Sequence, residues 1–74
     1  MKNMKLIRVL REDSQIKVQM ETGISQSLIS RYESGDAIPT GENLMILAKY
    51  YNTSIDFLMD LTDEQRPYPP KKTY

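Results

Sequence analysis

The most informative run in the chain is Gly23-Ile24-Ser25-Gln26-Ser27-Leu28-Ile29-Ser30-Arg31-Tyr32-Glu33-Ser34-Gly35. It predicts a tight turn followed by a short helix, because Gly23 permits the abrupt backbone that joins two helices and Ser25 can cap the first helical turn. Gly35 stands where a left-handed residue commonly ends a helix. Spacings of three and four residues then predict an inward stripe, formed by Ile29, Tyr32 and Glu33.

The opposite face of this predicted helix is small, polar and in one place basic. It carries Ser27, Ser30, Arg31 and Ser34, with Gln26 beside them. Such a face is rich in hydrogen-bond donors and has little bulk, which suits a helix that lies in the major groove of DNA. The run therefore predicts a DNA-reading helix over residues 26–34.

Composition limits the classes of function that remain. The 74 residues have room for a single domain, and they contain neither cysteine nor histidine. Disulfides, thiolate nucleophiles and histidine-based zinc sites or general bases are therefore excluded. The neighbouring carboxylates Glu12-Asp13 and Asp63-Glu64 fall in predicted loops, so we expect no enzyme, no catalytic residue, no cofactor and no metal. No apolar run approaches the roughly 20 residues of a membrane span, and no signal-peptide core opens the chain, so we expect a cytoplasmic domain with no membrane association.

Charge is balanced overall but not along the chain. Ten Lys and Arg residues against ten Asp and Glu residues give a formal net charge of zero, which by itself argues against a nucleic-acid partner. Residues 1–35 carry six basic and four acidic side chains, whereas residues 36–66 carry two basic and six acidic ones. The basic excess therefore lies in the half that contains the turn and the predicted reading helix.

Helical periodicity predicts five helices and no strand of useful length. The predicted helices span residues 4–12, 15–22, 26–34, 41–51 and 55–61. Four of them follow a residue that can cap a helix, namely Ser14, Ser25, Thr40 and Ser54. The first helix places its apolar residues at Met4, Ile7 and Leu10, and Asn52 suits a left-handed end of the fourth. From Thr62 the chain becomes proline-rich, so we expect a domain over residues 1–61 and a flexible tail over residues 62–74.

Taken together, these features resemble the helix-turn-helix repressors of the lambda-repressor-like class, the Xre or Cro family, over about residues 4–61. The pieces that carry the resemblance, in this order and spacing, are Ser14-Gln15, Thr22-Gly23-Ile24-Ser25, Ile29-Ser30-Arg31-Tyr32-Glu33-Ser34-Gly35, Pro39-Thr40, Glu42-Asn43-Leu44, Leu47-Ala48 and Ser54-Ile55-Asp56. The resemblance implies an all-α, five-helix DNA-binding domain in which the second and third helices form the helix-turn-helix.

The sequence departs from this family at two places. The family usually has Lys-Gly-Leu, or a similar turn, before the Ser-Gln that opens the second helix. Here Leu10 is followed by Arg11-Glu12-Asp13, so either the first helix lies closer to the second or these three residues fill the place of that turn. Gln19 stands where the family prefers a small residue, such as alanine, at a close contact between helices. Both departures bear on how the first two helices pack.

The resemblance also implies roles for single residues. Base reading would fall to Gln26, Ser27 and Arg31, since glutamine pairs bidentately with adenine and arginine with guanine. Contacts to the DNA backbone would come from Gln15, Lys17, Ser25, Ser30 and Ser34. The plainer alternative for Gln26, Ser27 and Lys17 is an ordinary solvated side chain. Glu33 would form a structural ion pair with an arginine of the first helix, which is Arg8 in an ungapped match and Arg11 in a gapped one.

The expected function is that of a sequence-specific regulator of transcription that binds double-stranded DNA. One reading helix covers only a few base pairs, so we expect a homodimer that represses from a two-fold operator. By resemblance, the dimer surface lies around the fourth and fifth helices with Leu61, and the protein acts in the cytoplasm, at the nucleoid of a prokaryote or a phage. Because these residues include no sensor domain, induction would come from a regulatory protein partner, proteolysis or a change in concentration.

Two alternatives to a plain repressor remain. The first is a protein–protein adaptor that keeps the helical fold without binding DNA, which the net charge of zero favours. The second is a DNA-binding antitoxin that neutralises a toxin through the Pro-Tyr-Pro-Pro tail, which toxin co-purification would separate from a plain repressor.

Overall fold

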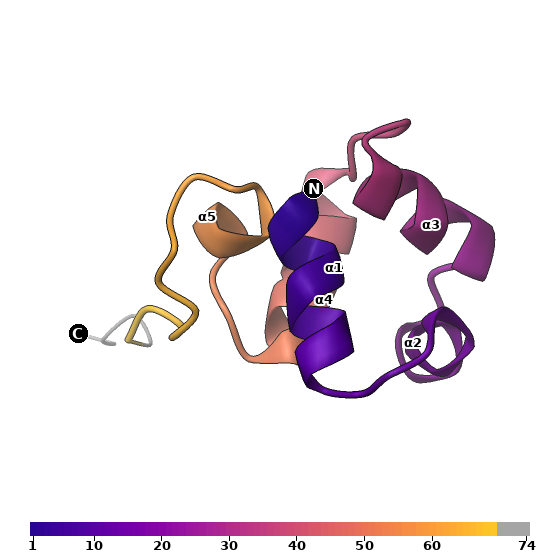
Figure 1. Cartoon of the computed structure of the whole chain (residues 1–74), viewed down its shortest axis with the longest axis horizontal. Helices are drawn as coiled ribbons and strands as arrows, with labels where there is room; N and C mark the ends of the chain where they lie inside the picture. Colours follow the sequence, from indigo (N-terminus) through magenta and orange to yellow (C-terminus); the bar gives the residue numbers. More distant parts are fainter. Residues whose placement is uncertain (70–74) are drawn as a thin grey trace.

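The computed structural model describes residues 1–69, which contain five α-helices. These are α1 (Lys2–Leu10), α2 (Gln15–Thr22), α3 (Gln26–Ser34), α4 (Gly41–Tyr51) and α5 (Ile55–Leu58). In Figure 1, α1 stands in front of α4 at the centre, with α5 on one side and the α2–α3 pair on the other. The prediction of an all-α fold with five helices is confirmed.

Four of the helices begin at the predicted side-chain caps. Ser14, Ser25, Thr40 and Ser54 have extended backbone, and each side-chain oxygen accepts a hydrogen bond from the main-chain N–H three residues further on. Three helices end at left-handed residues, namely Gly23, Gly35 and Asn52. As a result α2, α3 and α4 have the predicted bounds.

Asp60 explains why α1 begins, and α5 ends, earlier than predicted. The predicted spans, 4–12 and 55–61, are both wrong at these ends. The Asp60 carboxylate accepts hydrogen bonds from the main-chain N–H groups of Lys2 and Asn3, at 3.0 and 2.8 Å. The first turn of α1 is therefore capped by a residue that is distant in sequence. Asp60 is also left-handed, with φ of 65°, and this conformation terminates α5.

The C-terminal end of α1 is set by Glu12. This residue is left-handed, with φ of 59°, and the main-chain N–H groups of Glu12 and Asp13 donate back to carbonyl groups of the last helical turn at 2.9 and 3.1 Å. Arg11-Glu12-Asp13 therefore fill the place of the turn, which decides between the two alternatives left open by the sequence. Leu10, the last of the three apolar residues noted in the predicted first helix, is the last residue of α1 and is 59% exposed.

Replacing Glu12 by glycine is expected to stabilise the domain by about 1 kcal/mol, because a left-handed backbone costs other residues roughly that much more than it costs glycine. The Glu12 side chain is exposed, so its removal uncovers no core. Urea denaturation followed by circular dichroism measures the gain. The matched opposite change is Gly35→Ala, at φ of 88° with nothing within 4 Å of the added Cβ, which should destabilise by a similar amount. An unchanged midpoint for Glu12→Gly would show that the turn holds no strain.

The core is built from all five helices. The largest fully buried side chains are Met4, Val18, Ile29, Leu47, Phe57 and Leu58. The predicted inward stripe of α3 is confirmed, since its buried residues are Ile29, Tyr32 and Glu33. Because each helix contributes to one cluster, α2 and α3 are held in a fixed position relative to the rest of the domain.

The turn before α2 is fastened to α4 through Asp13. The Tyr50 hydroxyl donates a hydrogen bond to the Asp13 carboxylate at 2.7 Å, and this bond lowers the pKa of Asp13. Burial raises the pKa of Tyr50. The Arg11 guanidinium lies 5.1 Å from the centre of the Tyr50 ring, close enough for a cation–π contact. These contacts fix the point at which the chain enters α2.

Residues 62–69 follow α5 and are tied back to the domain at several points. Asn3 donates to the Thr62 carbonyl at 3.1 Å, and the Thr53 hydroxyl donates to the Gln65 carbonyl at 2.6 Å. The domain boundary at residue 61 and the flexibility of the 62–74 tail stay predictions. Residues 70–74 of that tail lie outside the described residues.

Candidate nucleic-acid interface

α3 lies at one edge of the domain (Figure 1). Its polar face is at least partly accessible to solvent. Of the side chains assigned to that face, the exposed ones are Ser27, Arg31 and Ser34, and the partly buried ones are Gln26 and Ser30. Leu28 packs against the core, so it belongs to the inner side of the helix. The three residues expected to read bases thus lie on one solvent-facing stretch of α3.

A buried ion pair joins α1 to the inner face of α3. Arg8 donates to the two carboxylate oxygens of Glu33, from Nε at 2.7 Å and from Nη2 at 2.9 Å, and the side chains are only 13% and 3% exposed. Arg8 Nη1 also donates to the carbonyl oxygen of Asp13 at 2.9 Å, and the bond to Glu33 raises the pKa of Arg8. Of the two arginines that the resemblance allows, the structure pairs Arg8 with Glu33, and Arg11 lies 3.6 Å from Asp13 instead.

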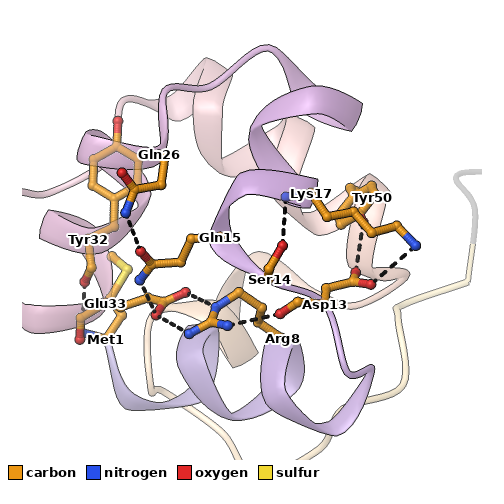
Figure 2. Close-up of polar contacts among 10 residues, drawn as sticks. All are labelled: Met1, Arg8, Asp13, Ser14, Gln15, Lys17, Gln26, Tyr32, Glu33 and Tyr50. Atoms are coloured by element: carbon orange, nitrogen blue, oxygen red, sulfur yellow. Dashed lines mark hydrogen bonds and ion pairs between the residues drawn. The ribbon is translucent and has the colours of Figure 1, made fainter.

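Gln15, the first residue of α2, connects this ion pair to the first residue of α3 (Figure 2). Its Nε2 donates to Glu33 at 3.1 Å, and its Oε1 accepts from Nε2 of Gln26 at 2.7 Å. The hydrogen bond to Gln15 uses one of the two side-chain N–H groups of Gln26. The second N–H group and the Oε1 atom do not take part in that bond. One acceptor and one donor are the set that glutamine needs for a bidentate pair with adenine.

A second glutamine of α2 contacts the same residue. Oε1 of Gln19 accepts a hydrogen bond from the main-chain N–H of Gln26 at 2.6 Å. Gln15 and Gln19 are four residues apart and lie on one side of α2. We did not predict a role for Gln19 at the site. The signal that could have found it is the pair of glutamines at helical spacing just before the turn into α3.

A polar hollow gathers three of the residues expected to contact the DNA backbone. It has a volume of about 150 Å³ and is lined by Lys5, Gln15, Ser30, Glu33 and Ser34. Lys5 was also missed from the sequence, although it stands three residues before Arg8 on α1 and so shares its side of the helix. The hollow therefore combines a lysine, two hydroxyl groups and the start of α2, next to the polar face of α3.

Lys17 and Ser25, also expected to contact the DNA backbone, are placed differently. Nζ of Lys17 lies 3.6 Å from the Asp13 carboxylate, on the far side of the close-up from Gln26 (Figure 2). The Ser25 hydroxyl oxygen accepts from the main-chain N–H of Leu28 at 3.1 Å and so serves as the cap of α3. The roles of Lys17 and Ser25 toward DNA stay predictions.

The helix-turn-helix family model matches residues 4–58, which include α2, α3 and the turn between them. The chain belongs to the lambda-repressor-like helix-turn-helix family. It is 30% identical over 69 residues to an uncharacterized HTH-type transcriptional regulator, YobD, of Bacillus subtilis (strain 168). That match covers 89% of this chain and 62% of the relative, so the chain spans less than two thirds of the length of that regulator. No solved structure gives a significant match.

Neither a membrane-spanning helix nor an acidic metal site occurs in the part of the chain that the structure describes. No helix within residues 1–69 is long and apolar enough to cross a membrane. The acidic side chains of the same residues form no group of three or more that could hold a metal ion.

Proposed function

We propose that this chain is a transcriptional regulator that binds a specific sequence of double-stranded DNA through α3. The observation that carries the proposal is the hydrogen-bonded series from Arg8 through Glu33 and Gln15 to Gln26. It connects a partly buried side chain of the polar face to a buried ion pair. The entropy cost of ordering Gln26 is therefore incurred on folding rather than on binding, which favours tight and selective recognition.

In this proposal the base edges are read by Gln26, Ser27 and Arg31. Gln26 pairs with adenine and Arg31 with guanine, because each presents the matching donors and acceptors. Arg31 is five residues further along α3, about 7.5 Å along the helix axis, so the two side chains reach different base pairs. The DNA backbone is held by Gln15, Lys17, Ser25, Ser30 and Ser34, to which we add Lys5 from the polar hollow.

The regulator acts, in the same proposal, as a repressor that occupies a two-fold operator as a homodimer in the cytoplasm. A single α3 reads too few base pairs to select one site, and two copies with reading helices about 34 Å apart would double the number. The contact between protomers would include two exposed apolar side chains next to α5, Met59 and Leu61. Neither a cofactor nor a metal takes part.

Selection from a pool of randomised duplexes tests this function, followed by fluorescence anisotropy at two salt concentrations with a shuffled duplex as the control. We expect enrichment of a two-fold sequence with half-sites about 10 base pairs apart and an affinity that falls as salt rises. No enrichment from a protein that circular dichroism shows to be folded and helical would reject the proposal.

A protein–protein adaptor is the second candidate, and two observations favour it. The chain has a formal net charge of zero. In addition, α1 leaves Leu6, Val9 and Leu10 exposed on its outer side. The selection experiment separates the two functions, because an adaptor would bind no duplex even at low salt.

A further inference from the structure

We infer that Gln19 is a positioning residue for the base contact made by Gln26, an inference that rests on the proposed DNA-binding function. Gln19 lies on α2, is exposed, and reaches across the turn to accept the main-chain N–H of Gln26 at 2.6 Å. A side chain much shorter than glutamine could not span the distance between α2 and this N–H group. The chain therefore carries a contact between its two helices that depends on the length of this side chain.

The contact acts on the first turn of the reading helix. The first amide groups of a helix have no partner within the helix. In α3 the Ser25 hydroxyl takes the N–H of Leu28, and Gln19 takes the N–H of Gln26. The remaining freedom of Gln26 lies in its side chain, and Gln15 holds that at 2.7 Å. Two glutamines one turn apart on α2 thus hydrogen-bond to Gln26, one at its main-chain N–H group and the other at its side-chain amide.

Both contacts are needed to aim the Gln26 amide. Hydrogen bonds between nitrogen and oxygen span only about 2.7–3.2 Å, so a small shift of the first turn of α3 is enough to break a bidentate pair with a base. Gln15 alone fixes the terminal amide of the Gln26 side chain but not the position of the Gln26 main chain. Loss of the Gln19 contact should therefore weaken the choice of base at the pair that Gln26 reads, and leave the other base pairs of the operator unaffected.

The experiment measures base preference at single positions of the selected duplex. The base pair read by Gln26 is identified first. It is the position at which a base-pair substitution lowers the affinity of the parent chain but does not change the affinity of Gln26→Ala. Gln19→Met keeps the length of the side chain but removes the acceptor, and Gln19→Ala removes both the length and the acceptor. For both we expect the preference at that base pair to fall about fivefold or more, the equivalent of one good hydrogen bond. Gln19→Glu keeps an acceptor oxygen, so it should retain the preference even if its charge lowers affinity for every duplex.

The double variant Gln19→Met with Gln26→Ala is expected to match Gln26→Ala alone in base preference, because Gln19 acts through Gln26. Met20→Ala is the control on the same helix, at a side chain that is 78% exposed, and should leave the preference unchanged. An unchanged preference in both Gln19→Met and Gln19→Ala, or an equal loss on all duplexes, would overturn the inference. Failure of the parent chain to bind any duplex is a different result, since it rejects the proposed function on which the inference depends.

Discussion

Glu33→Ala is expected to lower the free energy of unfolding by about 3–5 kcal/mol, because it leaves the Arg8 guanidinium buried without its counter-ion. The lost carboxylate accepts two hydrogen bonds from Arg8 and one from Gln15, and its side chain is 3% exposed. Small domains have total stabilities near the low end of about 5–15 kcal/mol. A loss at the upper end of this range would therefore leave as much as about half of the protein unfolded at room temperature.

Urea denaturation followed by circular dichroism measures this loss, and two further variants establish its cause. Arg66→Ala removes an ion pair with Glu64 at 2.9 Å in which both side chains are well exposed, so we expect no measurable shift of the midpoint. The double variant Arg8→Met with Glu33→Leu replaces the buried pair by apolar side chains and should recover most of the stability. A midpoint for Glu33→Ala equal to that of the parent chain would show that Arg8 is hydrated when unpaired and that the pair does not hold α1 to α3.

If Gln26 reads a base, as proposed, stability and recognition depend on the same carboxylate. Glu33 faces the core side of α3, yet through Gln15 it is two hydrogen bonds away from the amide of Gln26. Milder variants that keep the fold but weaken this connection should lose base preference before they lose folded protein. The arrangement accounts for the presence of a charged residue on the inward stripe, where an apolar residue would pack as well.

Local chemistry predicts the parts of the fold that depend on neighbours in sequence. Ser14, Ser25 and Thr40 cap their helices through N–H groups three residues away, and Gly23 and Gly35 end theirs through their own backbone. The information needed for α2, α3 and α4 lies within a few residues of each boundary. The helix-turn-helix was predictable for this reason.

Contacts between distant parts of the chain account for what could not be predicted. The start of α1 and the end of α5 both depend on Asp60, whose carboxylate caps a helix 57 and 58 residues away in sequence. No local pattern reports such a cap. The hydrogen bonds from Gln26 to Gln15 and Gln19 were not predicted for a related reason. The sequence alone does not indicate whether an amide side chain contacts water, DNA or another glutamine. Gln15 was predicted to contact the DNA backbone, and in the structure it also accepts a hydrogen bond from the side chain of Gln26, a predicted base reader.

Arg31→Ala is expected to relax the choice of base at one position of the operator by about 1–3 kcal/mol, or about five- to 150-fold, the range for a bidentate pair with guanine. The Arg31 side chain is exposed, and what α3 needs from this residue is its carbonyl group, which accepts from Asp36 and Ala37 at the end of the helix. Alanine keeps that carbonyl, so the variant should fold and melt like the parent chain.

The pattern of the loss across duplexes shows whether Arg31 reads a base or only neutralises a phosphate. Anisotropy titrations against the selected operator and its single-position substitutions should show a loss confined to duplexes that keep the guanine, because the other duplexes already lack the contact. Arg31→Lys keeps the charge without the planar fork, so it should recover only part of the preference. Lys49→Ala removes an exposed charge from α4 and should leave the order of bases unchanged. An equal loss on every duplex for Arg31→Ala would instead place this side chain on the DNA backbone, and base reading would then rest on Gln26 and Ser27.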